Sequence, residues 1–506
     1  MNRRDIFRGA GSGFFTGLLA RMGVPLNAAQ SPANIYQRIG VEPVINCKGT
    51  FTIISGSQTL PEVKRALDEA SRHYVHLDEL MDGVGRRLAE ITKAEWGIVT
   101  AGCAAALTHA TAASIAGSNP EKMQRLPGLE GLKNEVVMPR QSRNVYDHAI
   151  RMLGVKMITP NTREEFLAAL RPSTAMVALL GDTIPRHPMP LEEMTAAARA
   201  KGIPTIVDAA AERLTIPNVY LAKGVDMVAY SGGKCLRGPQ CAGLLLGRKD
   251  LLQAAWINSA PHHAFGRSLK VGKEEIMGML AAVEAWTERN HDAEWKQWEG
   301  WLATIRDKVA SLPTVRTQVL LPTTPSNYAP QLRVSWDVAQ LGATGREISD
   351  ALLAGKPRIV MPGGGNSVTI MPYMMMPGDD RIAAARLHEV LTHPPRPQKE
   401  PAPPSDAVLS GQWDVEIDFV RGQAVHTLYL EERGGKVVGQ HRGEFLSGDI
   451  RGTRDGARVE LRSSHRYEGT SIGYGFTGTL ASGGMSGTVD LDEYGKATFT
   501  AKRHWA

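Results

Sequence analysis

The stretch "AYSGGKCLRGPQCAGLLLG", residues 229–247, places one lysine, Lys234, among small residues between two apolar runs. Apolar runs of this kind are typical of buried strands, and the glycine-rich string between them is typical of a tight turn whose backbone closely approaches a ligand. Ligands of open α/β sheets bind at the carboxyl ends of the strands. Lys234 therefore stands where such a sheet presents a side chain to a ligand, although a solvated lysine would produce the same pattern.

Residues 31–392 repeat this alternation of apolar runs and helical segments. The runs "GIVTA", "MVALLG" and "PTIVDAA" are rich in Val and Ile, and stretches such as "PLEEMTAAARAKG" have helical periodicity. Continuous apolar runs separated by helices are typical of a mostly parallel sheet covered by helices on both faces. The sequence therefore predicts an α/β fold. At 506 residues the chain is also too long for a single compact core.

The C-terminal part of the chain has a different composition and residue pattern. The stretch "HPPRPQKEPAPPSD", residues 393–406, consists mainly of proline and polar residues, which predicts an extended linker. Beyond it, short runs alternate between apolar and polar residues and are separated by glycine pairs, which predicts a small all-β barrel or sandwich over residues 407–506. We expect its aromatic side chains to pack in the core, with a ligand site as the alternative. These aromatic residues are Trp413, Phe419, Tyr429, Tyr467, Tyr474, Phe476 and Phe499.

Residues 1–30 have the layout of an export signal. Arg3 and Arg4 precede a weakly apolar stretch and then small residues, an order that resembles a twin-arginine signal. Arg21 interrupts the apolar stretch, so a basic amphipathic helix is the alternative. The Gly-rich cluster at residues 9–13 follows no strand, which argues against a phosphate loop. We therefore expect a periplasmic or otherwise exported protein.

The composition of the chain argues against several classes of function. The formal net charge is +6, and the basic residues are scattered among acidic ones, so a nucleic-acid partner is not indicated. The four cysteines lack metal-ligand spacing and are too few for a disulfide framework, so we expect buried thiols and no metal site. No later segment has the roughly twenty continuous apolar residues of a membrane span.

Two further strand ends carry groups that complement a lysine. The first strand ends at Thr100 and is followed by "AGCAAALTHA", where the backbone N–H groups of Gly102, Cys103 and Ala104 would form an anion cradle at a helix N-terminus. Tight helix packing explains such small residues equally well. The second strand ends at Asp208 in "TIVDAAAE", where a buried carboxylate needs a cation or a hydrogen-bond donor. A helix cap is the alternative for Asp208.

Together the three strand ends match the needs of pyridoxal 5'-phosphate. The phosphate of this cofactor needs a helix N-terminus and a hydroxyl, which Ser231 supplies. Its pyridine nitrogen needs a carboxylate, and its aldehyde needs an amine to form a Schiff base. Lys234 follows Asp208 by 26 positions (234 − 208 = 26), and each would serve one of these needs. The sequence therefore predicts Lys234 and Asp208 as catalytic residues, with Ser231 and the helix N-terminus as cofactor ligands.

Four strings also resemble a known family. "SGGKCLRGPQCAGLLLGRKDL", "PTIVDAAAE", "EPVINCKGTFT" and "IVTAGCAAALTHATAA" closely resemble the fold-type I pyridoxal phosphate enzymes that include selenocysteine synthase (seryl-tRNA selenium transferase) and D-glucosaminate-6-phosphate ammonia-lyase. The resemblance covers residues 34–392. It implies a large αβα domain over residues 31–300, a small α/β domain over 301–392, and active sites formed between the subunits of a homodimer or larger homo-oligomer.

The resemblance also implies secondary site residues. In "PRQSRNVYDHA" the family usually has a histidine near the cofactor ring where Ser142 stands here, so Arg143 or His148 is the candidate instead. Arg358 stands where family members meet the substrate carboxylate, for which a guanidinium is suited, and a surface arginine is the alternative. Asp78 faces a neighbouring active site or is a helix-surface acid.

Both named relatives act on amino acids that bear a β-hydroxyl. In such a reaction the substrate amine displaces Lys234, and Lys234 then takes the α-proton. The resemblance thus implies an α,β-eliminating lyase for a small β-hydroxy amino acid or amino sugar acid, with Lys234 as Schiff-base lysine and proton-transfer group. The alternative is a transferase on seryl-tRNA, which the modest charge and the expected export argue against.

Two function classes outside this family are the remaining alternatives. Ser231 and Lys234 also fit the S-x-x-K pattern of penicillin-recognising enzymes, but that serine begins a helix, and no K-T-G string occurs in the chain. A non-catalytic cell-envelope binding protein is the other alternative. The presence of both Asp208 and Lys234 argues against it.

Overall fold

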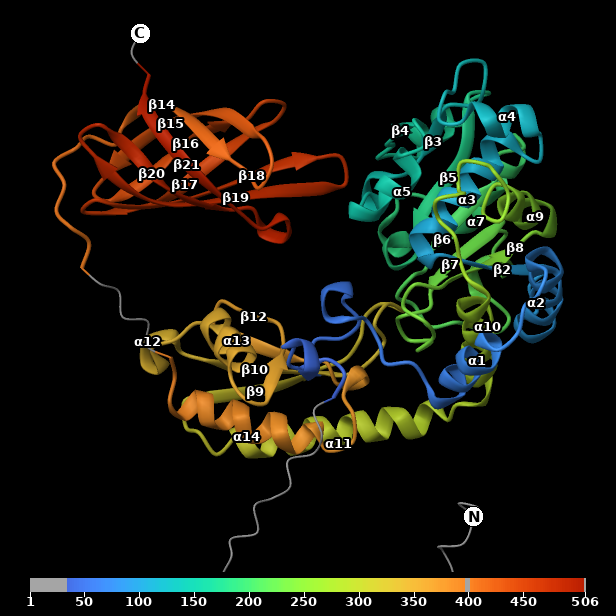
Figure 1. The fold of residues 1–506 in the computed structure, drawn as a ribbon, viewed down its shortest axis with the longest axis horizontal. Coiled ribbons are helices and arrows are strands. Elements are labelled where there is room, and N and C mark those ends of the chain that lie inside the picture. Colours follow the sequence, from blue (N-terminus) through green and yellow to red (C-terminus); the bar gives the residue numbers. More distant parts are fainter. Residues whose placement is uncertain (1–33, 396–400, 505–506) are drawn as a thin grey trace, which may run out of the picture.

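The computed structural model describes residues 34–395 and 401–504 (Figure 1). The three largest hydrophobic cores of the described residues lie within residues 81–286, within 302–391 together with Cys47, and within 409–501. The predicted α/β architecture with an all-β C-terminal unit is confirmed. The predicted signal at residues 1–30 and part of the predicted linker lie outside the described residues.

The large domain is built on a seven-stranded sheet with the order β2-β8-β7-β6-β5-β3-β4. The strands are β2 (Trp96–Thr100), β3 (Glu135–Val137), β4 (Lys156–Ile158), β5 (Thr174–Leu180), β6 (Thr205–Asp208), β7 (Met227–Ser231) and β8 (Gly243–Gly247). Strands β4, β3, β5, β6 and β7 are parallel, whereas β8 runs antiparallel to both of its neighbours. Strands β6 and β7 therefore end at the same edge of the sheet, as the sequence predicts.

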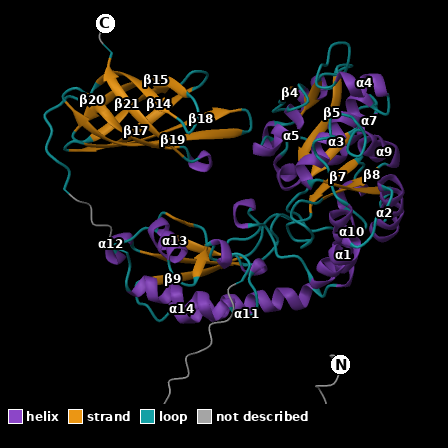
Figure 2. Ribbon diagram, in the orientation of Figure 1, coloured by secondary structure: helices purple, strands orange, loops and turns teal. Residues whose placement is uncertain are grey.

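Helices cover the sheet (Figure 2). They are α1 (Pro61–Ser71), α2 (Leu77–Thr92), α3 (Gly102–Ala116), α4 (Pro120–Arg125), α5 (His148–Arg151), α6 (Arg163–Ala169), α7 (Leu191–Arg199), α8 (Val219–Ala222), α9 (Lys249–Ile257) and α10 (Lys273–Glu288). Helix α3 buries 12 of its 15 residues, because it packs against the sheet, α5 and α9 at once. Its many alanines allow this close approach on several sides.

The small domain has a four-stranded sheet packed on helices. Its elements are α11 (His291–Val309), β9 (Val315–Leu320), β10 (Gln331–Trp336), α12 (Val338–Leu341), α13 (Gly345–Ala354), β12 (Gly363–Gly364), β13 (Ser367–Ile370) and α14 (Asp379–Thr392). Strand β1 (Val44–Asn46) pairs with β11 (Arg358–Val360) and brings Cys47 into this core. The predicted domain boundary at residue 300 falls inside α11, and residues 44–47 pack with the small domain.

The C-terminal unit is a closed eight-stranded barrel of antiparallel strands rather than a sandwich. Its strands are β14 (Gly411–Asp418), β15 (Gln423–Arg433), β16 (Lys436–Arg442), β17 (Ser447–Asp455), β18 (Arg458–Tyr467), β19 (Thr470–Ala481), β20 (Gly484–Asp490) and β21 (Lys496–Arg503). Trp413, Phe476 and Phe499 fill its core, whereas Tyr429 and Tyr467 are exposed. Figure 1 shows the end of the barrel with the β18–β19 turn beside α5 of the large domain.

The described residues contain neither a membrane-spanning helix nor a cluster of metal ligands. None of the helices there is long and apolar enough to cross a membrane. Within the same residues, no group of three or more His, Cys, Asp or Glu side chains is arranged to hold a metal ion.

Candidate active site

Lys234 lies in a compact turn between β7 and β8. The N–H of Gly232 donates to the carbonyl of Ala242 across 2.8 Å, and the N–H of Arg237 donates to the carbonyl of Lys234 across 2.9 Å. A Cβ on Gly233 would lie 2.6 Å from Gln240 Cα. The glycines therefore let the turn fold back on the segment that follows it, and the expected close approach of this turn to a ligand stays a prediction.

Asp208 ends β6 and is buried, with 5% of its surface exposed. Its Oδ1 accepts hydrogen bonds from the Ala210 N–H at 3.0 Å and from the Cys103 thiol at 3.5 Å. Burial raises the pKa of Asp208, and the Ala210 N–H and the charge of Lys234 oppose that shift. No helix begins at Asp208, because α8 starts only at Val219, so the helix-cap alternative is ruled out.

The N-terminus of α3 lies next to this carboxylate. Gly102 opens the helix with a φ of +82°, which favours glycine, and no side chain caps the helix at Ala101. A Cβ on Gly243 of β8 would lie 2.4 Å from the carbonyl carbon of Gly102, so strand and helix touch through glycine. The first turn of α3 thus leaves backbone N–H donors without a side-chain acceptor beside Asp208.

The amine of Lys234 has no hydrogen bond or ion pair within the described part of the chain. Its Nζ lies 5.9 Å from the centre of the Tyr146 ring. Lys234 also acts electrostatically on both Asp208 and Cys103, which places the three side chains in one neighbourhood. Tyr146 is a site residue that the sequence analysis missed, although it lies within the quoted string "PRQSRNVYDHA".

Ser142 and Arg143 are held by other contacts. The Ser142 hydroxyl lies 3.0 Å from His187 Nε2 and accepts from the Leu180 N–H at 2.9 Å, which agrees with our expectation that Ser142 does not replace the family's histidine. Arg143 donates to Asp147 Oδ2 at 2.6 Å and to the carboxylate of Glu468 in the barrel. The guanidinium of Arg143 is therefore occupied within the chain.

The other secondary candidates also have partners of their own. Arg358 donates to the carbonyls of Leu353 at 3.0 Å and Glu42 at 3.3 Å, so its predicted contact with a substrate carboxylate stays a prediction. Asp78 accepts from the Trp256 indole at 2.8 Å. His148 is exposed at the start of α5.

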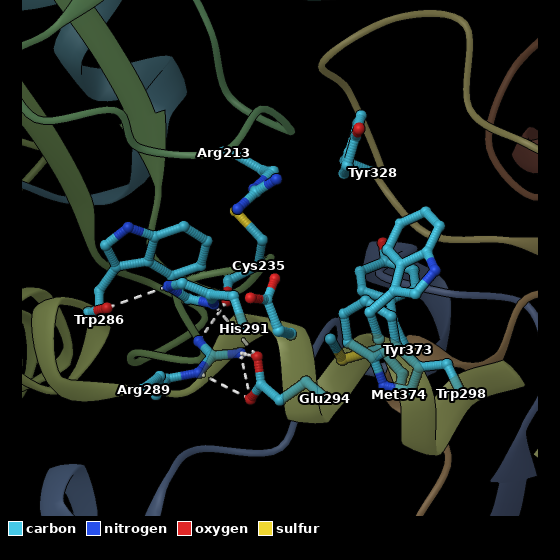
Figure 3. A pocket seen from close by; sticks show the side chains of 12 residues that line it. Arg213, Cys235, Trp286, Arg289, His291, Glu294, Trp298, Tyr328, Tyr373 and Met374 are labelled. Atoms are coloured by element: carbon cyan, nitrogen blue, oxygen red, sulfur yellow. Dashed lines mark hydrogen bonds and ion pairs between the residues drawn. The ribbon is translucent and has the colours of Figure 1, made fainter. Parts of the chain in front are cut away.

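A cavity of about 320 Å³ opens beside Cys235, the residue that follows Lys234 in the sequence (Figure 3). Its lining residues are Arg213, Cys235, Trp286, Arg289, His291, Asp292, Glu294, Trp295, Trp298, Tyr328, Tyr373 and Met374. Arg289 donates to the Cys235 carbonyl at 2.9 Å and forms an ion pair with Glu294 at 2.9 Å. The guanidinium of Arg213 lies 4.9 Å from the Tyr328 ring and has no acidic partner among the described residues. No sequence motif predicted this cavity.

The side chains fit the groups of pyridoxal 5'-phosphate. The uncapped N-terminus of α3 supplies donors for a phosphate, Asp208 supplies a buried carboxylate for the ring nitrogen, and Lys234 supplies an unpaired amine. Ser231 ends β7 beside this turn, and its predicted bond to the phosphate stays a prediction.

Comparisons with known proteins agree with this fit. Residues 141–266 match the Aminotransferase class-V family. The D-glucosaminate-6-phosphate ammonia lyase of Salmonella typhimurium is 26% identical over 374 residues, which are 71% of this chain and 98% of that protein. A solved structure of D-glucosaminate-6-phosphate ammonia-lyase matches with a TM-score of 0.63 and 26% identity, over 72% of this chain and 99% of that one.

Two other relatives have different activities. A 5'-C-glycyluridine monooxygenase-decarboxylase of Streptomyces sp is 29% identical over 375 residues, covering 70% of this chain and 92% of that protein. An L-seryl-tRNA(Sec) selenium transferase of Yersinia pestis is 25% identical over 50% of this chain and 60% of that protein. These matches, with the Aminotransferase class-V match and the fold, identify the chain as an enzyme that uses pyridoxal 5'-phosphate. It has the fold-type I architecture of such enzymes and is similar to the ammonia lyase and the selenium transferase.

Proposed function

We propose that this enzyme is an α,β-eliminating lyase that acts on a small β-hydroxy amino acid or amino sugar acid. The observation that carries the proposal is the grouping of Lys234, Asp208 and the uncapped α3 N-terminus in one neighbourhood. The similarity to an ammonia lyase along 98% of that protein's length supports the choice of reaction.

The roles of the chain's own groups follow from their chemistry. Bound pyridoxal phosphate supplies an electron sink for negative charge at the substrate α-carbon. The N–H groups at Gly102, Cys103 and Ala104 would bind its phosphate, and Asp208 would hold a proton at its ring nitrogen. Lys234 Nζ would anchor the cofactor and then accept the α-proton, because no carboxylate in the described residues ties up its amine.

Cys103 and Tyr146 support these groups. The Cys103 thiol donates to Asp208 Oδ1 and leaves the other carboxylate oxygen available for the ring nitrogen. The Tyr146 ring lies beside Lys234 Nζ and would limit the access of water to the amine on that side.

The cavity beside Cys235 supports a small anionic substrate. Its volume of about 320 Å³ is at the lower end of ligand pockets, which suits a single amino acid or sugar acid. Arg213 offers a guanidinium with no acidic partner among the described residues, which is suited to a carboxylate or phosphate. Arg289 is neutralised by Glu294, so we assign substrate binding to Arg213 in addition to the predicted Arg358.

The proposal is tested by incubating the enzyme with D-glucosaminate 6-phosphate, D-glucosaminate, L-serine and D-serine, and by measuring ammonia and 2-oxo acid. We expect one of these substrates to release both products in equal amounts, and Lys234→Ala to release neither. Oxygen consumption with release of CO₂, or turnover of seryl-tRNA alone, would contradict the lyase assignment. Absence of cofactor binding would instead support the non-catalytic alternative.

We also propose that the protein is exported through its twin-arginine-like N-terminus. The paired Arg3 and Arg4 support this proposal. Replacement of both arginines by lysine should leave the protein in the cytoplasm of its host, and equal periplasmic amounts of the variant and the wild type would contradict export.

We further propose that the enzyme is a homodimer or larger homo-oligomer. Large apolar side chains near the start of the described chain are exposed, including Ile39 at 75%, Ile53 at 86% and Tyr74 at 101%. Exposed large apolar side chains are typical of surfaces that bind another chain. Sedimentation equilibrium of the full chain should give at least twice the mass of one chain, and a monomer would contradict the proposal.

A further inference from the structure

The barrel touches the large domain through the β18–β19 turn. Glu468 in this turn accepts a hydrogen bond from Arg143, and the Tyr467 ring centre lies 5.8 Å from the guanidinium of Arg151. A Cβ on Gly469 would lie 2.1 Å from the backbone oxygen of Asn144, so the turn meets residues 143–151 in direct contact. This contact joins residues more than 300 positions apart in the sequence.

The charges at this contact are balanced only when the barrel is in place. Asp147 is fully buried and accepts from Arg143 at 2.6 Å and from Arg151 at 2.9 Å. Two guanidinium groups around one carboxylate leave one positive charge. Glu468 supplies the second carboxylate, and Arg143 is only 9% exposed there. Partly buried, charge-assisted pairs of this kind are stronger than exposed ones.

The turn is also held in a costly backbone conformation. Glu468 has a φ of +51°, in the left-handed region that a residue with a side chain adopts at a cost. Such conformations persist where surrounding contacts require them, and they cluster at functional sites. In this turn the left-handed residue is the one whose carboxylate reaches Arg143.

The contacted segment leads to the cofactor site. Tyr146 lies between Arg143 and Asp147 in the sequence, in a 3-10 turn (Val145–Asp147) capped by Asn144. Its ring lies 5.9 Å from Lys234 Nζ. Whatever fixes Arg143, Asn144 and Asp147 therefore also fixes the ring beside the catalytic amine.

We propose that the barrel is a structural part of the active site, and that Glu468 is a positioning residue that holds residues 143–151, and with them Tyr146, beside Lys234. Relatives that match 92% and 98% of their own length account for only 70% and 71% of this chain, so this chain carries additional sequence. The proposal does not depend on the identity of the substrate.

The direct test is hydrogen exchange of the full-length protein followed by mass spectrometry. Glu468→Gln removes the charge, and Gly469→Ala pushes the turn from Asn144. Both should raise the exchange rate of peptides covering residues 143–152 on the order of ten-fold. The matched controls are Glu431→Gln, whose carboxylate is 69% exposed, and Gly483→Ala, where a Cβ meets no atom within 4 Å. The controls should leave these peptides unchanged.

A second measurement links the contact to the site. Cofactor-loaded Glu468→Gln should show an altered visible absorption band and a lower kcat with a smaller change in KM, whereas Glu468→Asp should restore part of both. Unchanged exchange in residues 143–152 in both Glu468→Gln and Gly469→Ala would overturn the proposal. This outcome does not depend on catalysis, so it is distinct from a failure of the lyase assignment. Altered exchange with wild-type absorption and kinetics would likewise overturn the link to Tyr146.

Discussion

The thiol of Cys103 donates a hydrogen bond to Oδ1 of Asp208 across 3.5 Å. Cys103 belongs to the first turn of α3 and Asp208 ends β6, so this bond joins the helix that would bind the cofactor phosphate to the carboxylate that would bind the ring nitrogen. Burial raises the pKa of the Cys103 thiol, which therefore stays protonated and acts as a donor. The two halves of the cofactor site are thus fixed relative to each other.

Replacing Asp208 by Asn should lower the activity of the enzyme without lowering its stability. The variant loses the negative charge that keeps the ring nitrogen protonated, so kcat/KM should fall on the order of a hundred-fold or more. The cofactor should remain attached, because Lys234 is unchanged. Ammonia release and the visible spectrum of the same preparation measure the two effects.

The cofactor-free Asp208→Asn variant should be at least as stable as the cofactor-free wild type at pH 8. Burial raises the pKa of Asp208 above its ordinary value of 3.8 in the folded protein. The unfolded chain therefore ionises at a lower pH than the folded protein, and at pH 8 this difference destabilises the folded protein. Asparagine does not ionise and removes this cost. A midpoint of thermal unfolding several degrees below that of the wild type would contradict the stated cause of the pKa shift.

Gly243→Ala, a substitution on strand β8, should displace the anion cradle at the N-terminus of α3. The new Cβ would lie between 2.4 and 2.6 Å from the backbone of Gly102 and Cys103. Overpacking of this kind costs about 1 to 3 kcal/mol of unfolding free energy. We expect weaker binding of pyridoxal phosphate, because the first turn of α3 must move. Urea unfolding and cofactor titration of the apoprotein provide the measurements.

Gly300→Ala is the matched control for this substitution. Gly300 lies inside α11, and a Cβ there meets no atom within 4 Å. Alanine in a helix interior is favoured over glycine by about 1 kcal/mol, so this variant should be slightly more stable and should bind cofactor normally. If both variants bound cofactor equally well, the close approach of β8 to α3 would have no role in binding.

Glu212→Gln should change how stability depends on pH. Oε2 of Glu212 accepts from the Tyr220 hydroxyl at 2.6 Å, whereas Oε1 is buried without a hydrogen-bond partner in the described residues. Burial raises the pKa of Glu212 from 4.5 to about 7. The unfolded chain therefore loses its proton first, and the wild type loses stability as the pH rises from 4.5 to about 7.

The loss for the wild type should reach on the order of 3 kcal/mol above pH 7. Glutamine cannot ionise, so the unfolding free energy of the variant should rise relative to that of the wild type between pH 5 and pH 8. Unfolding free energies measured at both pH values test this. Glu431→Gln, at an exposed carboxylate, is the control. A constant difference between the Glu212→Gln variant and the wild type at both pH values would show that Glu212 is ionised in the folded protein.

The strand ends of the large domain were predictable from the sequence. Thr100, Asp208 and Ser231 each end a strand where the apolar run ends. A parallel sheet buried on both faces requires continuous apolar runs, so the first polar residue marks the exposed edge at which ligands bind. Local composition alone was enough for this part of the site.

Tyr146, Arg213 and Glu468 were not predictable in the same way. Tyr146 and Arg213 are exposed residues in irregular segments, and only the packing of distant elements places them near Lys234 or Cys235. Glu468 looks like an ordinary turn residue until the barrel meets Arg143. The roles of these residues depend on tertiary contacts, which hydrophobic periodicity does not encode.

The central claim is that Lys234 is the amine that bonds pyridoxal phosphate. We would load the full-length protein with the cofactor, reduce it with borohydride, and locate the modified peptide by mass spectrometry beside Lys234→Ala and the control Lys249→Ala. The account predicts a visible absorption band and a single reduced adduct on Lys234, both lost in Lys234→Ala and kept in Lys249→Ala. A protein that binds no cofactor, or an adduct that persists on another lysine in Lys234→Ala, would contradict it.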